Sequence, residues 1–417
     1  MKGIYIDIPV DAAVFRAYLA VPEQERGPGI VLCQEIFGVN AAMRAKADFL
    51  AEEGYTVLVP DLYWRQAAGV ELGYTAEDHE KAFELYKHFD IESSIKDIQA
   101  SLTTLGQLQV CDTTVGLSVV GYCLGGKLAY LAACRIATLA CAVSYYGVGI
   151  EQYLHEAQNI HAKTVLHFAG LDQFCPAEVR TEIMTALRQY SNIQTYVYAN
   201  AEHAFARPEG QHYQKSSALI AHERSISALR KAVGPDYDLE ALWEEHIRLE
   251  FDARDVKATM ATMVAEPYVN HIPTLTGGVG YQALSRFYRY HFVHNNPQDI
   301  ALTPISRTVG LTQVVDEFIM SFTHDQEIDW LIPGIPATGK FVEIPMLGVI
   351  KFRGPKLCHE HIYWDQASIL LQLGVLDARG LPIAGAVAAH KLLDENLPSN
   401  QLMPTWPSSA GKSIDAV

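Results

Sequence analysis

The first candidate for a catalytic residue in this sequence is a cysteine whose thiol lies in a glycine-rich turn. Cys123 stands in Gly121-Tyr-Cys-Leu-Gly125, between an apolar run and an alanine- and leucine-rich helical segment. The spacing matches the G-x-S-x-G elbow, in which a strand turns sharply into a helix and exposes a nucleophile. The N–H groups and dipole of such a helix N-terminus favour a thiolate. The alternative is a structural cysteine, because free cysteine is among the most buried residue types.

A cysteine nucleophile needs a base to share its proton and a third group to fix that base's tautomer. Asp172 follows the apolar run 164–168 and His203 follows the run 193–198, which gives the order nucleophile, acid, histidine of elbow hydrolases. Taken alone, an aspartate that follows a glycine turn is more commonly a cap than a catalytic acid. A single histidine likewise more commonly has a structural role. Because all three follow predicted strands, at the edge where open α/β sheets bind ligands, the sequence predicts a catalytic triad.

The elements that must position these groups alternate through the first half of the chain. Residues 3–22 alternate apolar and polar side chains in two runs, which predicts an antiparallel strand pair. Helical patterns then separate apolar runs of the kind buried on both faces of a sheet. The sequence therefore predicts an α/β fold with a mostly parallel sheet and helices on both faces. The predicted strands after the pair are 30–33, 56–60, 114–120, 141–147, 164–168 and 193–198.

The order of predicted helices and strands changes after Gly234-Pro235-Asp236, where one helix ends and another amphipathic pattern soon begins. Residues 261–300 are interpreted as short helices and 301–375 as mainly strands, an order typical of an α+β domain. We therefore expect domains at 1–234 and 235–391, and a tail at 392–417 that is disordered because it is rich in Pro, Ser and Asn. The opening helix of the second domain carries Leu239, Leu242, Trp243, His246, Ile247 and Phe251 at three- and four-residue spacing.

Composition limits the partners. A net charge of −16 over 417 residues argues against nucleic acid or an anionic membrane as partner, because both require a basic face. The seven cysteines form no C-x-x-C pair, and their odd number suits a reducing compartment. The N-terminus lacks the apolar core of a signal peptide, and Arg135 interrupts the apolar segment from Leu128 before it could span a bilayer. We expect a cytoplasmic protein.

Residues 1 to about 233 resemble the dienelactone hydrolase family, the carboxymethylenebutenolidases of the α/β-hydrolase fold. The resemblance rests on Gln34-Glu-Ile-Phe-Gly-Val-Asn40, Gly121-Tyr-Cys-Leu-Gly-Gly126, Tyr145-Tyr-Gly-Val-Gly149, Gly170-Leu-Asp-Gln-Phe174 and His203-Ala-Phe-Ala-Arg207. It implies Cys123 as nucleophile, His203 and Asp172 as its partners, and Glu35 as the carboxylate that holds the resting thiol. Substrate binding would free Glu35 to take the thiol proton, and water would hydrolyse the resulting acyl-enzyme.

The same resemblance implies a substrate, a lactone or small ester met in aromatic-compound degradation, and neither a cofactor nor a metal. It assigns the oxyanion hole to the backbone N–H groups of Ile36 and Leu124. It also implies that Arg207 pairs with a substrate carboxylate and that Tyr145 lines the pocket.

Three positions depart from the family pattern. His79 stands where we expect a second carboxylate-binding arginine, Phe83 where we expect a tyrosine, and Tyr86 where we expect a tryptophan. A histidine lacks the bidentate fork of arginine and is only partly charged at neutral pH. We therefore expect weaker binding of an anionic dienelactone. The alternatives to a cysteine hydrolase that opens a lactone or cleaves a small ester are a general carboxylesterase or thioesterase and a non-catalytic ligand-binding protein.

Residues from about 238 to 390 resemble the nuclear-transport-factor-2-like domains of the polyketide-cyclase kind, α+β cones that range from catalysts to dimerisation modules. This resemblance rests on the opening helix, Gly280-Tyr-Gln-Ala-Leu-Ser-Arg-Phe-Tyr288 and Cys358-His-Glu-His-Ile-Tyr-Trp364. It implies a ligand-binding or homodimer-forming attachment, with His271 and Asp365 as candidate pocket residues. His359 and His361 share one face of a predicted strand, but no third metal ligand accompanies them, so no metal site is predicted.

Overall fold

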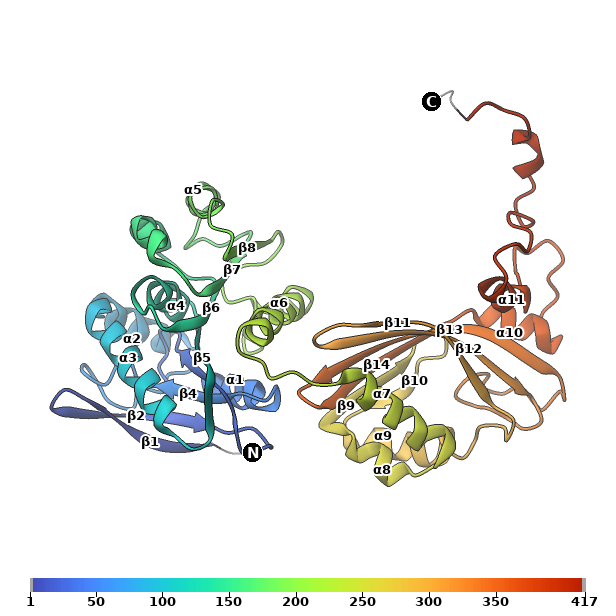
Figure 1. Cartoon of the computed structure of the whole chain (residues 1–417), viewed down its shortest axis with the longest axis horizontal. Helices are drawn as coiled ribbons and strands as arrows, with labels where there is room; N and C mark the ends of the chain where they lie inside the picture. The colour runs from blue at the N-terminus through green and yellow to red at the C-terminus, as the bar shows by residue number, and fades with distance from the viewer. Residues whose placement is uncertain (1–2, 415–417) are drawn as a thin grey trace. The chain divides into compact units, whose positions relative to one another are not determined.

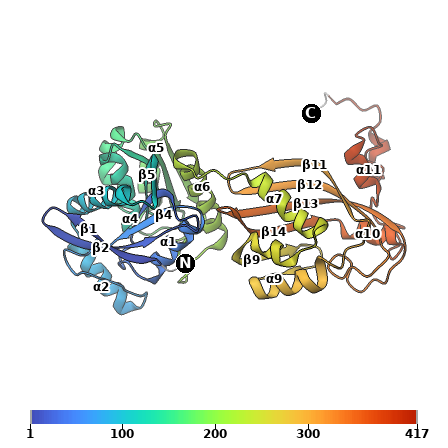
Figure 2. The same ribbon diagram turned by 60° about the horizontal axis from the view of Figure 1, so that its bottom comes forward.

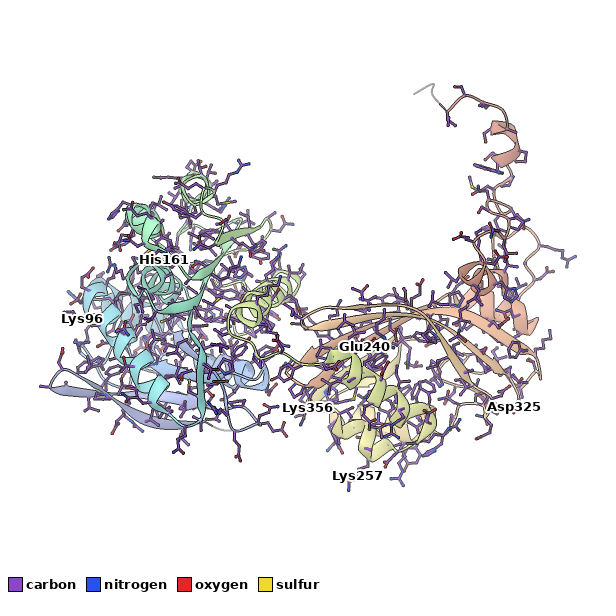
Figure 3. The ribbon with its side chains drawn as sticks, viewed as in Figure 1. Lys96, His161, Glu240, Lys257, Asp325 and Lys356 are labelled. Carbon is purple, nitrogen blue, oxygen red and sulfur yellow. The ribbon has the colours of Figure 1, made fainter. Side chains whose placement is uncertain are left out.

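The computed structural model describes residues 3–414 and divides the chain into two compact units, Met1–Tyr237 and Asp238–Val417 (Figure 1). The division falls close to the boundary expected after Gly234. Figure 3 shows side chains filling the interior of each unit. Within residues 3–414, no helix is long and apolar enough to cross a membrane.

The described part of the first unit contains one eight-stranded sheet with the order β1-β2-β4-β3-β5-β6-β7-β8. β1 and β2 form the predicted antiparallel pair, β2 also pairs antiparallel with β4, and the remaining neighbours are parallel. This is the mostly parallel sheet that the sequence predicts. The strands are β1 (Ile4–Val10), β2 (Ala13–Ala20), β3 (Gly27–Cys33), β4 (Thr56–Pro60), β5 (Cys111–Tyr122), β6 (Leu139–Tyr145), β7 (Lys163–Ala169) and β8 (Ile193–Tyr198).

Helices cover both faces of this sheet (Figure 1). The strands alternate their side chains between two cores: Val31 packs in a cluster with α3, α4 and α5, and Ile30 packs in another with α1 and α6. Burial on both faces explains why the strands are continuous apolar runs. The helices are α1 (Ala41–Glu52), α2 (Ala76–Lys87), α3 (Ile91–Gln107), α4 (Leu124–Arg135), the 3₁₀ segment η1 (Ile150–Asn159), α5 (Ala177–Leu187) and α6 (Lys215–Val233).

The second unit is α+β. Its described residues form a six-stranded sheet with the order β10-β9-β14-β13-β12-β11, in which only the β14 and β9 pair is parallel. Figure 2 shows α7 lying across the strands of this sheet. The strands are β9 (Met263–His271), β10 (Thr276–Val279), β11 (Ala301–Val309), β12 (Gln313–Thr323), β13 (Phe341–Arg353) and β14 (Lys356–Trp364). The helices are α7 (Leu239–Ile247), the π-helical η2 (Arg248–Asp252), α8 (Val256–Ala261), α9 (Tyr281–Phe287), the π-helical η3 (Tyr288–Phe292), α10 (Gln366–Leu373) and α11 (Val387–Leu393).

The prediction of short helices throughout 261–300 is wrong for its first part, where β9 and β10 form a hairpin. Gly277 allows close strand pairing in this hairpin, because a Cβ on it would lie 2.1 Å from the carbonyl oxygen of Val269. In the tail expected to be disordered, the described residues are mostly exposed and include a short 3₁₀ helix, η4 (Trp406–Ser409). Residues 415–417 of that tail lie outside the described residues.

Candidate active site

The elbow predicted around Cys123 is present. β5 ends at Tyr122, α4 begins at Leu124, and Cys123 between them has φ 55° and ψ −113°. A non-glycine residue in that region of backbone space is strained and persists only where its surroundings hold it. Here the Cys123 N–H donates to the carbonyl of Tyr145 at 3.0 Å. Gly121 is required as well, because its Cβ would lie 1.9 Å from the carbonyl oxygen of Gly125.

The predicted base and acid are in contact. Nδ1 of His203 lies 2.8 Å from Oδ2 of Asp172, which is only 4% exposed. The other oxygen of Asp172 accepts a hydrogen bond from the backbone N–H of Phe174 at 2.9 Å. Both oxygens of Asp172 are therefore oriented, and the one facing His203 holds the proton on Nδ1. Nε2 is left for the exchange of a proton with a nucleophile.

The environment of His203 favours its charged form. Burial alone would lower the pKa of His203, but the charges and hydrogen bonds of Cys123 and Asp172 outweigh burial and raise the pKa to about 10. An imidazolium next to a thiol favours the thiolate, which is the nucleophilic form of cysteine. A charged histidine beside a thiol is an arrangement that can support covalent catalysis.

Glu35 lies in the same cavity but not in the role expected of it. Its carboxylate accepts hydrogen bonds from Arg207 Nη1 at 3.1 Å and from the Tyr146 hydroxyl at 3.3 Å. The side chains of Glu35 and Arg207 are 3% and 8% exposed, so each supplies the counter-charge that the other's burial demands. The resemblance predicted that Glu35 holds the thiol. The structure shows the carboxylate paired with the arginine assigned to the substrate.

A cavity of about 390 Å³ joins these groups. Of the predicted substrate residues, His79, Phe83 and Arg207 line it. Ile36 lines it too, and Leu124 is the first residue of α4, where backbone N–H groups have no acceptor within the helix. The described lining is Glu35, Ile36, Phe37, His79, Phe83, Tyr86, Cys123, Val148, Leu171, Gln173, Phe174, Glu202, His203, Ala204, Arg207 and His212.

Tyr145 departs from the expectation that it lines this cavity. It is 2% exposed, its ring stacks on Tyr122 with centroids 4.4 Å apart, and its hydroxyl lies 2.7 Å from the Ser225 hydroxyl. The alternation along β6 turns its side chain into the core beneath α6. The next residue, Tyr146, has φ 39° and turns towards Glu35 and His203 instead.

Sequence reasoning missed several groups that line this cavity or contact its residues. Tyr146 was quoted in a motif without a role, although it bonds Glu35 and packs edge-on against His203 with centroids 5.0 Å apart. The ring of Phe174 packs on the same histidine at 4.9 Å. Glu202 and His212 form a hydrogen-bonded pair on the cavity wall. In the sequence, only the closeness of Glu202 to His203 and of Phe174 to Asp172 could have indicated these residues.

The second unit has its own cavity, of about 250 Å³. His271, a candidate pocket residue, lines it, and burial lowers its pKa to about 3. Asp365 instead caps α10, where its carboxylate accepts a hydrogen bond from the Ala367 N–H at 3.0 Å. The rings of His359 and His361 stack with centroids 4.5 Å apart.

A mostly parallel sheet with a nucleophile elbow, and with an acid and a histidine after later strands, defines the first unit as an α/β-hydrolase. The model of the Dienelactone hydrolase family matches residues 15–233, and the chain belongs to that family. It is a hydrolase of the kind that acts on ester bonds.

Known relatives match the same part of the chain. A carboxymethylenebutenolidase of Pseudomonas putida is 38% identical over 229 residues, which cover 55% of this chain and 95% of that protein. Carboxymethylenebutenolidase 1 of Cupriavidus pinatubonensis is 31% identical over 223 residues, covering 53% and 93%. Among solved structures, a putative dienelactone hydrolase from Klebsiella pneumoniae aligns with a TM-score of 0.49 and 24% identity, covering 55% of this chain and all of that one.

Proposed function

We propose that the first unit opens a lactone or cleaves a small ester through an acyl-enzyme on Cys123. The observation that carries this proposal is the convergence, in one cavity, of a strained Cys123 with His203, whose ring is oriented by Asp172. The Cys123 thiolate attacks the carbonyl carbon, and the oxyanion is held by the N–H groups of Ile36 and Leu124. Removing one such donor typically costs about 3 kcal/mol of barrier.

The remaining proton transfers run through His203. As the carbonyl re-forms, the C–O bond to the leaving alkoxide breaks, and the imidazolium of His203 gives that oxygen its proton. The neutral imidazole then takes a proton from water, which attacks the thioester carbonyl. Collapse of that second intermediate expels the thiolate of Cys123 and restores the imidazolium beside it. The acid product leaves, and no cofactor takes part in these steps.

The Glu35 and Arg207 pair bears on which substrates bind. A substrate carboxylate would compete with Glu35 for the Arg207 guanidinium, and Glu35, once displaced, is a base available to a thiol. A neutral ester leaves the pair intact. With His79 rather than an arginine on the cavity wall, permanent positive charge there is limited to Arg207, which is already engaged. This favours a broad carboxylesterase or thioesterase as the second candidate.

The test compares wild-type protein with Cys123→Ala on dienelactone and on p-nitrophenyl acetate, with folding followed by circular dichroism. Cys134→Ala is the matched control, because Cys134 is a buried cysteine of the same helix outside the cavity. We expect Cys123→Ala to abolish turnover of both substrates and Cys134→Ala to retain it. A folded Cys123→Ala variant with wild-type activity would overturn the proposal. The relative kcat/KM for the two substrates distinguishes a dienelactone hydrolase from a general esterase.

For the second unit we propose a nuclear-transport-factor-2-like domain that binds a ligand in its cavity or pairs with a second copy of the chain. The support is the opening helix α7, the mixed sheet and the enclosed cavity between them. Sedimentation equilibrium of the full chain tests the homodimer. A monomer at all concentrations would remove pairing and leave ligand binding.

A further inference from the structure

Three ligand-type side chains converge in the core of the second unit. His246 lies on α7, Glu250 lies one turn later on η2, and Glu360 comes from β14. Nε2 of His246 is 3.0 Å from Oε1 of Glu250 and 3.1 Å from Oε1 of Glu360. The three residues are 0%, 3% and 4% exposed. Their donor atoms all lie within 4.8 Å of one another.

The tautomer of His246 is fixed from behind. Its Nδ1 lies 2.6 Å from the hydroxyl oxygen of Thr262, and that hydroxyl donates its hydrogen to the carbonyl of Thr259 at 2.7 Å. The hydroxyl has one hydrogen to give, so towards His246 it can only accept. When the ring is neutral, its proton therefore sits on Nδ1, and Nε2 is the nitrogen available to a metal ion. Metal-binding histidines are held in this way, with the second ring nitrogen donating to an oxygen behind the ring.

The facing atoms lack the hydrogen bonds that their burial calls for. Among the described residues, neither Nε2 of His246 nor Oε1 of Glu250 has a hydrogen bond of acceptable geometry, despite the short separations. Leaving buried polar atoms without a hydrogen bond is unfavourable. Zn²⁺ bonds to nitrogen and oxygen of about 2.0–2.2 Å imply ligand-to-ligand distances of about 3.3–3.6 Å at a tetrahedral angle, so a bound ion would move the two carboxylate oxygens only slightly away from Nε2.

We propose that His246, Glu250 and Glu360 form a binding site for one divalent transition-metal ion, with Zn²⁺ as its probe. Two carboxylates balance the charge of such an ion, which makes the loaded site neutral in a buried setting. An imidazole ligand selects Zn²⁺ and its neighbours over Mg²⁺ and Ca²⁺, which prefer oxygen ligands throughout. The site is independent of the chemistry at Cys123.

The site also has an open side. Glu250 and Glu360 both line the cavity of about 250 Å³, whose walls include Phe292, Phe318 and Trp330. A three-ligand ion keeps a fourth position for water or for a ligand oxygen, and that position faces this cavity. The ligand class is accordingly a small, mostly apolar molecule that carries an oxygen donor.

Among the described residues, two arginines line this cavity, and both are paired with other carboxylates. Arg248 binds Glu245 through Nε and Nη2, both at 2.7 Å. Arg307 binds Asp316 through both Nε and Nη2 at 3.0 Å, and its Nη1 lies 3.0 Å from Glu244. It also reaches Glu240 at 3.3 Å, a residue labelled on α7 in Figure 3. Three carboxylates thus account for the charge of Arg307.

The experiment is calorimetric titration of the full-length protein with Zn²⁺ after dialysis against a chelator, with the metal content measured by mass spectrometry. We expect about one Zn²⁺ per chain, and a binding constant at least 100-fold weaker in Glu250→Gln and in Glu360→Gln. Glu343→Gln is the matched control, because Glu343 also contacts a histidine, His390, but at the surface of the same unit. Binding to this control should equal that of the wild type.

Two further variants keep the test decisive. Thr262→Val leaves all three ligands but removes the acceptor behind His246, so Zn²⁺ should bind about 10–100-fold more weakly even if a glutamine variant fails to fold. Titration of Cys123→Ala excludes Zn²⁺ held by the thiol and imidazole of the first unit, and should retain the one bound ion. Absence of Zn²⁺ binding in the wild type, or equal binding in Thr262→Val and the folded glutamine variants, would overturn the proposal. His246 would then be an imidazolium between two carboxylates.

Discussion

Replacing one carboxylate oxygen of Asp172 by an amide nitrogen should reverse the tautomer of His203. In Asp172→Asn, the backbone N–H of Phe174 remains a fixed donor 2.9 Å from one side-chain position. The amide oxygen must face that donor, so the amide NH₂ faces Nδ1 of His203, which lies 2.8 Å from the other position. Nδ1 then has to accept, and the ring proton moves to Nε2. A histidine protonated there in its neutral form cannot take a proton from water or thiol.

The expected magnitude follows from this inversion. In a serine protease the corresponding change lowers kcat by about 10⁴, which is about 5.4 kcal/mol of activation free energy. We expect a loss of that order in the hydrolysis of p-nitrophenyl acetate. The pKa of His203 should also fall from about 10, because one of the charges that raises it is gone. Stability should fall by about 1.5–3 kcal/mol, the usual contribution of a hydrogen bond to a charged group.

Asp61→Asn is the matched control for Asp172→Asn. Asp61 is also a buried aspartate after a strand, and it accepts hydrogen bonds from the N–H groups of Tyr63 and Gly69, at 3.1 and 2.7 Å, away from the cavity. Its variant should lose stability but keep kcat. Stopped-flow kinetics with urea denaturation separates the two effects. If Asp172→Asn retains kcat within threefold while folded, Asp172 does not set the state of His203, and the triad assignment fails.

Three further expectations follow from the first unit. His79→Arg should lower KM for dienelactone about tenfold without improving p-nitrophenyl acetate hydrolysis, and an unchanged KM would show that position 79 does not set charge preference. Gly121→Ala should destabilise the fold by several kcal/mol because of the 1.9 Å approach to Gly125. Gly106→Ala in α3, whose Cβ would make only ordinary contacts at 3.7 Å with Leu117 and Thr113, should stabilise by up to about 1 kcal/mol in urea titrations. Burial lowers the pKa of His167 from 6.5 to about 3. The stability held above pH 6.5 should therefore fall by about 1.4 kcal/mol per pH unit towards pH 3, a slope that a folded His167→Gln variant should lack.

The parts of the first unit that the sequence predicted are those governed by local rules. Strands buried on both faces are continuous apolar runs, and the elbow is confined to five residues between one strand and one helix. Parallel strands bring their ends to one edge, so the order Cys123, Asp172, His203 was enough to predict that the three meet. Each of these inferences needed only sequence spacing and one geometric rule.

The parts that failed depend on side-chain direction and on competition between partners. Tyr145 and Tyr146 are adjacent, and with φ of 39° it is Tyr146 that contacts Glu35 and His203. No composition rule gives that angle. Glu35 had two partners within reach of the same cavity, a thiol and a guanidinium, and the structure shows the guanidinium as the one bound. A buried carboxylate gains more from a full positive charge than from a thiol, which is a comparison of energies rather than a pattern.

In the second unit, the proposed metal ligand of β14 lies on the opposite face of the strand from the two histidines that the sequence suggested. The sequence drew attention to His359 and His361, which share one side of β14, and between them Glu360 points to the other side. Glu360 is 4% exposed, whereas its two neighbours are only partly buried, so the residue between the histidines is the one that enters the core. His246 was counted as part of an apolar helical stripe, the usual reading of a histidine among leucines. η2 continues α7 and places Glu250 beside His246, which also contacts Glu360. The proposed metal site therefore lies at the inner face of β14.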